Sequence, residues 1–157
     1  MNGSSHPALR AAVTPLAAAP HGFSTQLTMT IPSDLALVED AIEVICSHLH
    51  AGFPDERTLR FNLRVALAEA LANAMEYGNG GDPSKSVMIH VRSGPQCVEI
   101  EVADEGPGFD PGAVPDPTAP ERVSLETGRG LFLIQRLMDE VRFNAKGNAI
   151  CMILRGA

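Results

Sequence analysis

Two hydrophobic repeats, with periods of about 2 and about 3.6 residues, alternate along this chain and restrict its fold more than any other feature. From Phe23 to Ile31, apolar residues alternate with Ser, Gln and Thr, as in a half-buried strand. In chain order the expected elements are a strand at 23–31, helices at 33–49 and about 57–77, strands at 87–91 and 98–102, a helix from 128, and strands at 141–143 and 149–154. Runs of adjacent strands with few crossovers favour a mixed or antiparallel sheet. The sequence therefore predicts an α+β fold, a two-layer α/β sandwich whose mixed, mostly antiparallel sheet carries its helices on one face.

The two ends of this pattern set the expected domain. Residues 1–22 are rich in Ala, Pro, Ser and Gly and show no hydrophobic period, which predicts a disordered tail. Residues 23–157 are then one domain of ordinary size. Pro32 ends the first strand, and Ser33 is expected as the N-cap of the first helix.

Composition excludes several classes of function. The formal net charge is −7 and no basic run occurs, so binding to nucleic acid, which depends on clustered Lys and Arg, is not expected. No stretch reaches the roughly 18 apolar residues of a membrane span, and the N-terminal stretch lacks a secretory signal. A cytoplasmic location is the default expectation, with Cys46, Cys97 and Cys151 as buried small hydrophobic residues.

A polar pair lies on the second expected helix. Glu69 and Asn73 are four residues apart and therefore share a helical face, which Glu76 continues. A solvated polar stripe is one interpretation. The other is a site, because an Asn oxygen is a hard neutral ligand suited to Mg²⁺ and small alanines beside it let a ligand come close. Glu69, one turn earlier, would then accept a proton from an attacking hydroxyl or orient a water.

A second polar segment follows the strand at 98–102. Asp104 is placed to point into a cavity at the sheet edge, where its carboxylate would accept a hydrogen bond from the adenine amine. Gly106 and Gly108 lack a Cβ and would let the ring approach the backbone. The alternative is an acidic turn without a ligand.

The third segment, Gly128-Arg129-Gly130-Leu131, stands at the expected start of a helix. Unpaired N–H groups at a helix N-terminus bind anions, and Arg129 adds a charged donor for phosphate. A flexible hinge is the alternative. Neither a P-loop nor a Rossmann fingerprint is present. Residues 110–127 contain four prolines and no hydrophobic period, which suits a lid over a ligand or a surface loop.

Together the three segments suit a pocket for adenine, magnesium and a phosphate chain, and they resemble the N, G1 and G2 boxes of the Bergerat-type ATPase superfamily, also called GHKL. More narrowly, the chain resembles the stand-alone serine kinase/anti-sigma factors of bacterial partner-switching systems. The stretches that carry the resemblance are Glu69-Ala-Leu-Ala-Asn73-Ala-Met-Glu-Tyr77-Gly, Val102-Ala-Asp104-Glu-Gly-Pro-Gly108-Phe and Gly128-Arg-Gly-Leu-Phe-Leu-Ile-Gln-Arg-Leu-Met-Asp-Glu140-Val. Two departures are Glu76, where many members have His, and the proline-rich lid.

The resemblance implies a role for each position. Glu69 would be the catalytic base and Asn73 the Mg²⁺ ligand, while Asp104 would contact adenine. The remaining implied nucleotide-binding residues are Gly106 and Gly108 at the adenine and Gly128, Arg129, Gly130 and Leu131 at the phosphates. ATP and Mg²⁺ are the implied cofactors. The implied partners are an anti-anti-sigma (STAS-domain) protein as substrate, a sigma factor as sequestered partner, and a second copy in a homodimer.

Three functions follow from these observations. The leading hypothesis is an ATP-dependent serine-protein kinase and anti-sigma factor that transfers the γ-phosphoryl group of ATP to a serine. One alternative is a non-catalytic ATP-binding module that sequesters a regulatory partner. The other is a detached histidine-kinase-like catalytic domain, which the absence of a phospho-acceptor helix disfavours.

Overall fold

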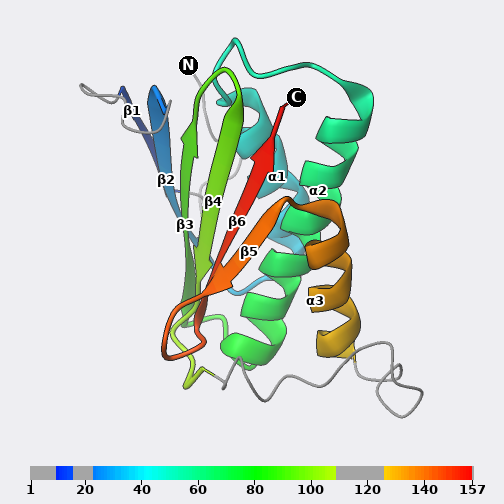
Figure 1. The fold of residues 1–157 in the computed structure, drawn as a ribbon. Helices are drawn as coiled ribbons and strands as arrows, with labels where there is room; N and C mark the ends of the chain where they lie inside the picture. Colours follow the sequence, from blue (N-terminus) through cyan, green and yellow to red (C-terminus); the bar gives the residue numbers. More distant parts are fainter. Residues whose placement is uncertain (1–9, 16–22, 109–125, 157) are drawn as a thin grey trace.

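The structure, a computed structural model, describes residues 10–15, 23–108 and 126–156 (Figure 1). The strands are β1 (Arg10–Pro15), β2 (Thr25–Pro32), β3 (Ser86–Ser93), β4 (Cys97–Ala103), β5 (Glu140–Phe143) and β6 (Ala149–Arg155). The helices are α1 (Val38–Ser47), α2 (Arg57–Asn73) and α3 (Glu126–Leu137), with a 3-10 turn η2 (Leu35–Leu37) before α1 and a π-helical turn η3 (Ala74–Gly78) after α2. The predicted lid at 110–127 falls almost entirely outside the described residues, as do residues 1–9 and 16–22 of the predicted tail.

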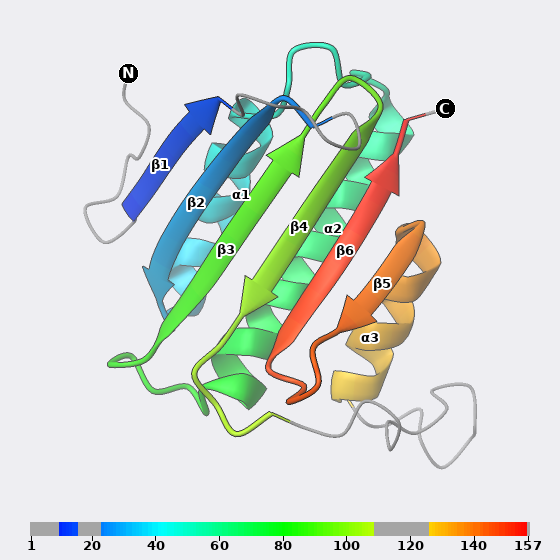
Figure 2. The ribbon, with the colours of Figure 1, turned by 60° about the vertical axis from the view of Figure 1, so that its left-hand side comes forward.

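The six strands form one sheet in the order β1-β2-β3-β4-β6-β5, and every described pairing is antiparallel. All three α-helices cover the same face of this sheet, as Figures 1 and 2 show from two directions. The other face carries no described helix. The predicted two-layer α+β sandwich is therefore confirmed.

The core lies between the sheet and the helices. Each central strand buries every second residue, and α2 runs along the middle of the sheet with its apolar side inward. The fully buried large side chains are Leu27, Ile31, Leu37, Ile42, Ile45, Leu63, Leu67, Leu71, Met75, Ile89, Ile100 and Ile134. Within the described residues, no helix has both the length and the apolar character to cross a lipid bilayer.

Several local expectations differ from the structure. The predicted tail is wrong for residues 10–15, which pair with β2 as β1. Ser33 does not cap a helix: its hydroxyl donates to the Lys85 carbonyl, and the Asp34 carboxylate caps the Ala36 amide instead. Helix α3 begins two residues before Gly128, so that glycine lies inside the first turn. The three cysteines are half-buried rather than buried.

Candidate functional site

The carboxyl half of α2 brings Glu69 and Asn73 against the start of α3. A Cβ built on Gly130 would lie 2.9 Å from Glu69 Oε2 and 3.0 Å from Asn73 Nδ2. Only a glycine lets the two helices approach this closely without displacing those side chains. The structure thus brings together three residues from two of the predicted segments.

The helix changes its hydrogen-bonding pattern directly after Asn73. In the π-helical turn η3, the Asn79 amide donates to the Ala74 carbonyl five residues earlier, at 2.8 Å. Such turns inside helices occur frequently at functional sites. Glu76, which the sequence places on the face of Glu69 and Asn73, instead lines a separate groove with Leu35 and Pro83. That part of the predicted polar face is wrong.

Asp104 follows β4 and its carboxylate packs on the backbone of the π-helical turn. Asp104 Oδ1 accepts a hydrogen bond from the Gly106 amide at 2.8 Å. A Cβ on Gly78 would lie 2.2 Å from Asp104 Oδ2, and a Cβ on Gly106 would lie 1.8 Å from the Gly78 carbonyl oxygen. Glycine is therefore needed at position 106 because two loops pack closely there. The sequence alone suggests another reason, the approach of a ligand to the backbone.

The pKa of Asp104 is raised above its ordinary value, mainly because burial penalises the charged form. The hydrogen bond from Gly106 and the charges of Lys146 and Lys85 act in the opposite direction and lower it. A half-buried carboxylate held by one amide presents a strong acceptor toward the cavity. Such an acceptor suits an amine donor like that of adenine.

The turn between β5 and β6 closes over the Asp104 loop from the other side. The Asn148 carbonyl accepts from the Asp104 amide at 2.9 Å, and Asn148 Nδ2 donates to the Asp104 carbonyl at 3.0 Å. Asn144 Oδ1 in turn accepts from the amides of residues 147–149, at 2.7 to 3.2 Å. Gly108 has φ +79°, and a Cβ there would lie 2.0 Å from the Lys146 carbonyl oxygen. Both features require glycine at this position.

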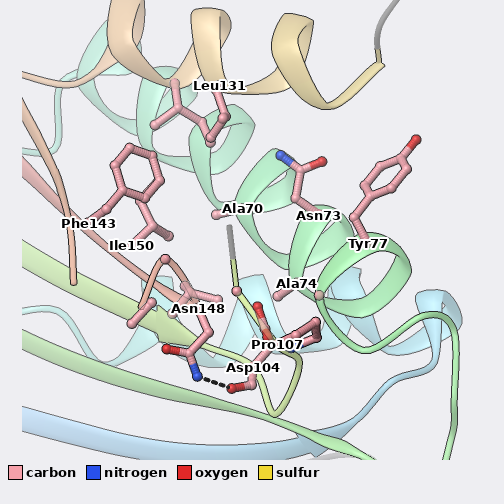
Figure 3. A pocket seen from close by; sticks show the side chains of 16 residues that line it. Ala70, Asn73, Ala74, Tyr77, Asp104, Pro107, Leu131, Phe143, Asn148 and Ile150 are labelled. Carbon is pink, nitrogen blue, oxygen red and sulfur yellow. Dashed lines mark hydrogen bonds between the residues drawn. The ribbon is translucent and has the colours of Figure 1, made fainter. Parts of the chain in front are cut away.

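These elements enclose a cavity of about 190 Å³ between α2, α3, β4 and the β5–β6 turn (Figure 3). In Figure 3, Asn73 projects near α3, whereas Asp104 lies beside Asn148. Apolar side chains supply most of the wall between them. The lining residues are Ala70, Asn73, Ala74, Tyr77, Gly78, Val102, Asp104, Pro107, Gly108, Leu131, Ile134, Phe143, Gly147, Asn148, Ala149 and Ile150. A mainly apolar slot with a few polar groups at its ends is the usual form of a ligand pocket.

The third predicted segment contributes to this cavity in part. Leu131 lines it, and Gly130 is buried beside Glu69 and Asn73. Arg129 is exposed and does not line the cavity, and Gly128 lies in the first turn of α3. The first-turn amides of a helix have no partner within the helix, so the start of α3 offers N–H donors for phosphate.

Among the residues of the site that the sequence reasoning missed, Gly78, Asn148 and Tyr77 are the most informative. Gly78 and Asn148 contact Asp104 directly, and Tyr77 lines the cavity. Gly78 lies in a turn-forming run, and Asn148 lies in a hairpin turn, where Gly and Asn are common for conformational reasons. Nothing in the sequence distinguishes these positions from ordinary turns.

Two observations test whether the site fits a nucleotide and a metal ion. Asn73 Nδ2 is buried and has no hydrogen-bond partner. Among the described residues, every other buried side-chain nitrogen or oxygen has one. A half turn of the amide presents its oxygen instead, the ligand type that Mg²⁺ takes together with phosphate and water oxygens. The described residues hold no cluster of three or more His, Cys, Asp or Glu suited to a metal. The Asn73 amide supplies one neutral oxygen, a donor that suits an ion held mainly by a phosphate chain.

Comparison with known proteins identifies the family. Residues 31–154 match the model of the histidine kinase-like ATPase domain. The serine-protein kinase RsbW of Oceanobacillus iheyensis is 34% identical over 98 residues, which cover 59% of this chain and 62% of that protein. RsbW of Bacillus subtilis is also 34% identical over 98 residues, covering 58% and 61%, and RsbW of Listeria innocua is 28% identical over 87 residues, covering 52% and 55%.

The match covers about three fifths of the length of these curated relatives. The family model, by contrast, covers most of this chain, from β2 to β6. The chain belongs to the histidine kinase-like ATPase domain family, and membership implies that it binds ATP.

Proposed function

We propose that this protein is an ATP-dependent serine-protein kinase and anti-sigma factor of a bacterial partner-switching system. Its substrate would be an anti-anti-sigma protein with a STAS domain, and its sequestered partner a sigma factor. The similarity to RsbW serine-protein kinases supports the reaction type. The observation that carries the proposal is that Glu69 and Gly130 meet at Asn73, which lines one end of the cavity.

Residues at one end of the cavity would bind adenine, and residues at the other end would bind Mg²⁺ and the phosphates. At one end, Asp104 binds the adenine amine and the apolar wall covers the ring. At the other end, Asn73 would hold Mg²⁺, and the first-turn amides of α3, with Arg129, would bind the phosphates. Gly106 and Gly108 hold the Asp104 loop in shape, and Leu131 closes the wall. When bound, ATP would supply the phosphoryl group, and Mg²⁺ would offset the negative charge of the phosphates.

Glu69 would act as the general base for the hydroxyl of the acceptor serine. Its carboxylate lies beside Asn73 and Gly130, where the phosphate end of the nucleotide is expected. A serine hydroxyl that enters there would donate its proton to Glu69 as its oxygen attacks. The rest of the rate would come from positioning and charge stabilisation. A cytoplasmic location and a homodimer belong to the same proposal.

A phosphotransfer assay with a matched pair of variants tests the proposal. The partner is first captured from native cells in the presence and absence of ATP, and is then incubated with the purified chain and Mg-ATP. Phosphoserine on the partner is expected by mass spectrometry. Glu69→Gln should lower its rate at least about a hundredfold. Glu76→Gln, in the π-helical turn that follows α2 and away from the cavity, should leave the rate unchanged.

The outcomes separate the candidate functions. A partner that co-purifies but stays unmodified would favour sequestration without catalysis. Undiminished transfer by Glu69→Gln would remove Glu69 as the base. Phosphate on a histidine of the partner would favour the histidine-kinase-like alternative.

A further inference from the structure

Asn79, directly after the π-helical turn, has a buried side chain whose polar groups are all engaged. It is 2% exposed. Its Nδ2 donates to Ser33 Oγ at 2.8 Å and to the Ser86 carbonyl at 3.0 Å. Its Oδ1 accepts from the Glu105 amide at 2.8 Å. An amide has two donor hydrogens and one acceptor oxygen, so this environment fixes both its position and its orientation.

The bond to Glu105 reaches the loop that carries Asp104. Glu105 is the next residue in the chain, and its own carboxylate accepts from the Ser86 amide at 2.5 Å. On the other side of the loop, Asn148 holds the amide and carbonyl of Asp104. Asn79 and Asn148 therefore hold the same short loop from two different elements. Asn148 lines the cavity, whereas Asn79 does not.

Asn79 is also bonded to the end of the helix that carries the other half of the site. Its amide closes the π-helical turn on Ala74, which follows Asn73 directly. The side chain thus joins the end of α2 to the loop of Asp104. A shift of one relative to the other would change the separation between the metal end and the adenine end of the cavity.

We propose that Asn79 is a positioning residue for nucleotide binding, which sets the place of the Asp104 carboxylate by fixing the Glu105 amide to the end of α2. The inference rests on the nucleotide site proposed above. Asn79 acts through Asp104 and does not touch the ligand. Its loss leaves the Glu105 amide and the Ser33 hydroxyl to find other partners, and the loop moves.

The test is a double-mutant cycle between Asn79 and Asp104, with ADP as the probe and calorimetry as the measurement. Asn79→Ala is expected to raise the Kd of ADP about tenfold, the effect of one net hydrogen bond to the loop. In an Asp104→Asn background, the same substitution is expected to change the Kd less than about twofold, because its effect passes through that carboxylate. A role in stability alone would leave the Kd of the folded protein unchanged in both backgrounds, and an effect on binding that does not pass through Asp104 would give the same fold-change in both.

A matched control uses a buried polar network at the opposite end of the sheet. Ser93 is 1% exposed, and its Oγ contacts Thr25 Oγ1 at 2.8 Å and accepts from the His50 amide at 2.9 Å. Ser93→Ala should lower the free energy of unfolding in urea yet leave the Kd of ADP unchanged. If Asn79→Ala does not fold, Ser33→Ala removes one acceptor of Asn79 and should raise the Kd about twofold to threefold, again only when Asp104 is present.

Each possible result either supports or overturns the role of Asn79 in positioning Asp104. Coupled effects of Asn79 and Asp104, with a silent Ser93 control, support the positioning role. Equal fold-changes in both backgrounds, or an unchanged Kd in Asn79→Ala and Ser33→Ala, overturn it while leaving the nucleotide site intact. Failure of the unaltered protein to take up ADP would overturn the nucleotide site and the positioning role together.

Discussion

Replacement of Gly78 by alanine is expected to abolish most nucleotide binding without unfolding the protein. Gly78 ends the π-helical turn and, unlike Gly80 and Gly81, does not have a positive φ angle. Alanine therefore fits its backbone conformation, and a helical setting favours alanine over glycine by up to about 1 kcal/mol. The nearest obstacle is the Asp104 carboxylate, which a Cβ would approach to 2.2 Å at Oδ2 and 2.3 Å at Cγ.

The size of the effect follows from that contact. Ordinary contact with a Cβ begins at 3.4 Å, so the carboxylate must move by roughly 1 Å or rotate. Either movement breaks the 2.8 Å hydrogen bond from the Gly106 amide, and a bond to a charged group contributes about 1.5–3 kcal/mol. A displaced acceptor no longer meets the adenine amine. The Kd of ADP is therefore expected to rise about tenfold to a hundredfold.

Calorimetry measures the Kd of ADP, and unfolding in urea measures the free energy of unfolding. Gly80→Ala is a control that should change the second quantity and not the first. A Cβ on Gly80 would meet nothing within 4 Å, but its φ of +64° strains any other residue. Gly80→Ala should lower the free energy of unfolding by about 1 kcal/mol and leave the Kd unchanged. Unaltered ADP binding by Gly78→Ala would show that the Asp104 carboxylate is not the adenine contact.

Three further predictions concern the ends and the wall of the cavity. Because burial raises the pKa of Asp104, the stability that its protonated form contributes is lost as the pH rises through that raised value. The amide of Asp104→Asn does not titrate, so its free energy of unfolding in urea should rise relative to that of the wild type between acid and neutral pH, with the two closest in acid, where the wild-type carboxyl is protonated. The Kd of this variant for ADP should rise about tenfold to a hundredfold. Asn73→Ala should remove the dependence of ADP affinity on Mg²⁺ in a magnesium titration and leave the affinity measured with EDTA unchanged. Ile134→Ala, at a fully buried position in the cavity wall, should lower the free energy of unfolding by about 3 kcal/mol in a urea titration.

The fold could be predicted almost completely because its signals are local and repetitive. Alternation in β3 and β4 and the apolar face of α2 each extend over several residues, so single exceptions do not hide them. Strand β1 was missed because the side chains of Arg10, Ala11 and Ala12 are all exposed and show no alternation. Its pairing with β2 is specified by backbone hydrogen bonds, which leave no trace in the residue types.

The site could be predicted only where side-chain chemistry marks it. Glu69 and Asn73 are recognisable as a polar pair on one face of the helix, and Asp104 as an acidic residue directly after an alternating strand. Asn79 and Asn148 act through hydrogen bonds to distant backbone groups, at separations of 26 and 44 residues along the chain. Such contacts depend on the packed structure, so an asparagine in a turn carries no sign of them.

The wrong placement of Glu76 has a specific cause in the π-helical turn. In a regular α-helix, residues 69, 73 and 76 lie on one face. Between Ala74 and Asn79 the hydrogen bond spans five residues instead of four, which widens the turn and rotates every later residue relative to that face. Glu76 therefore leaves the cavity, while Gly78 and Asn79 turn toward the Asp104 loop. The irregular turn that misled the periodicity argument is the feature that joins the two halves of the site.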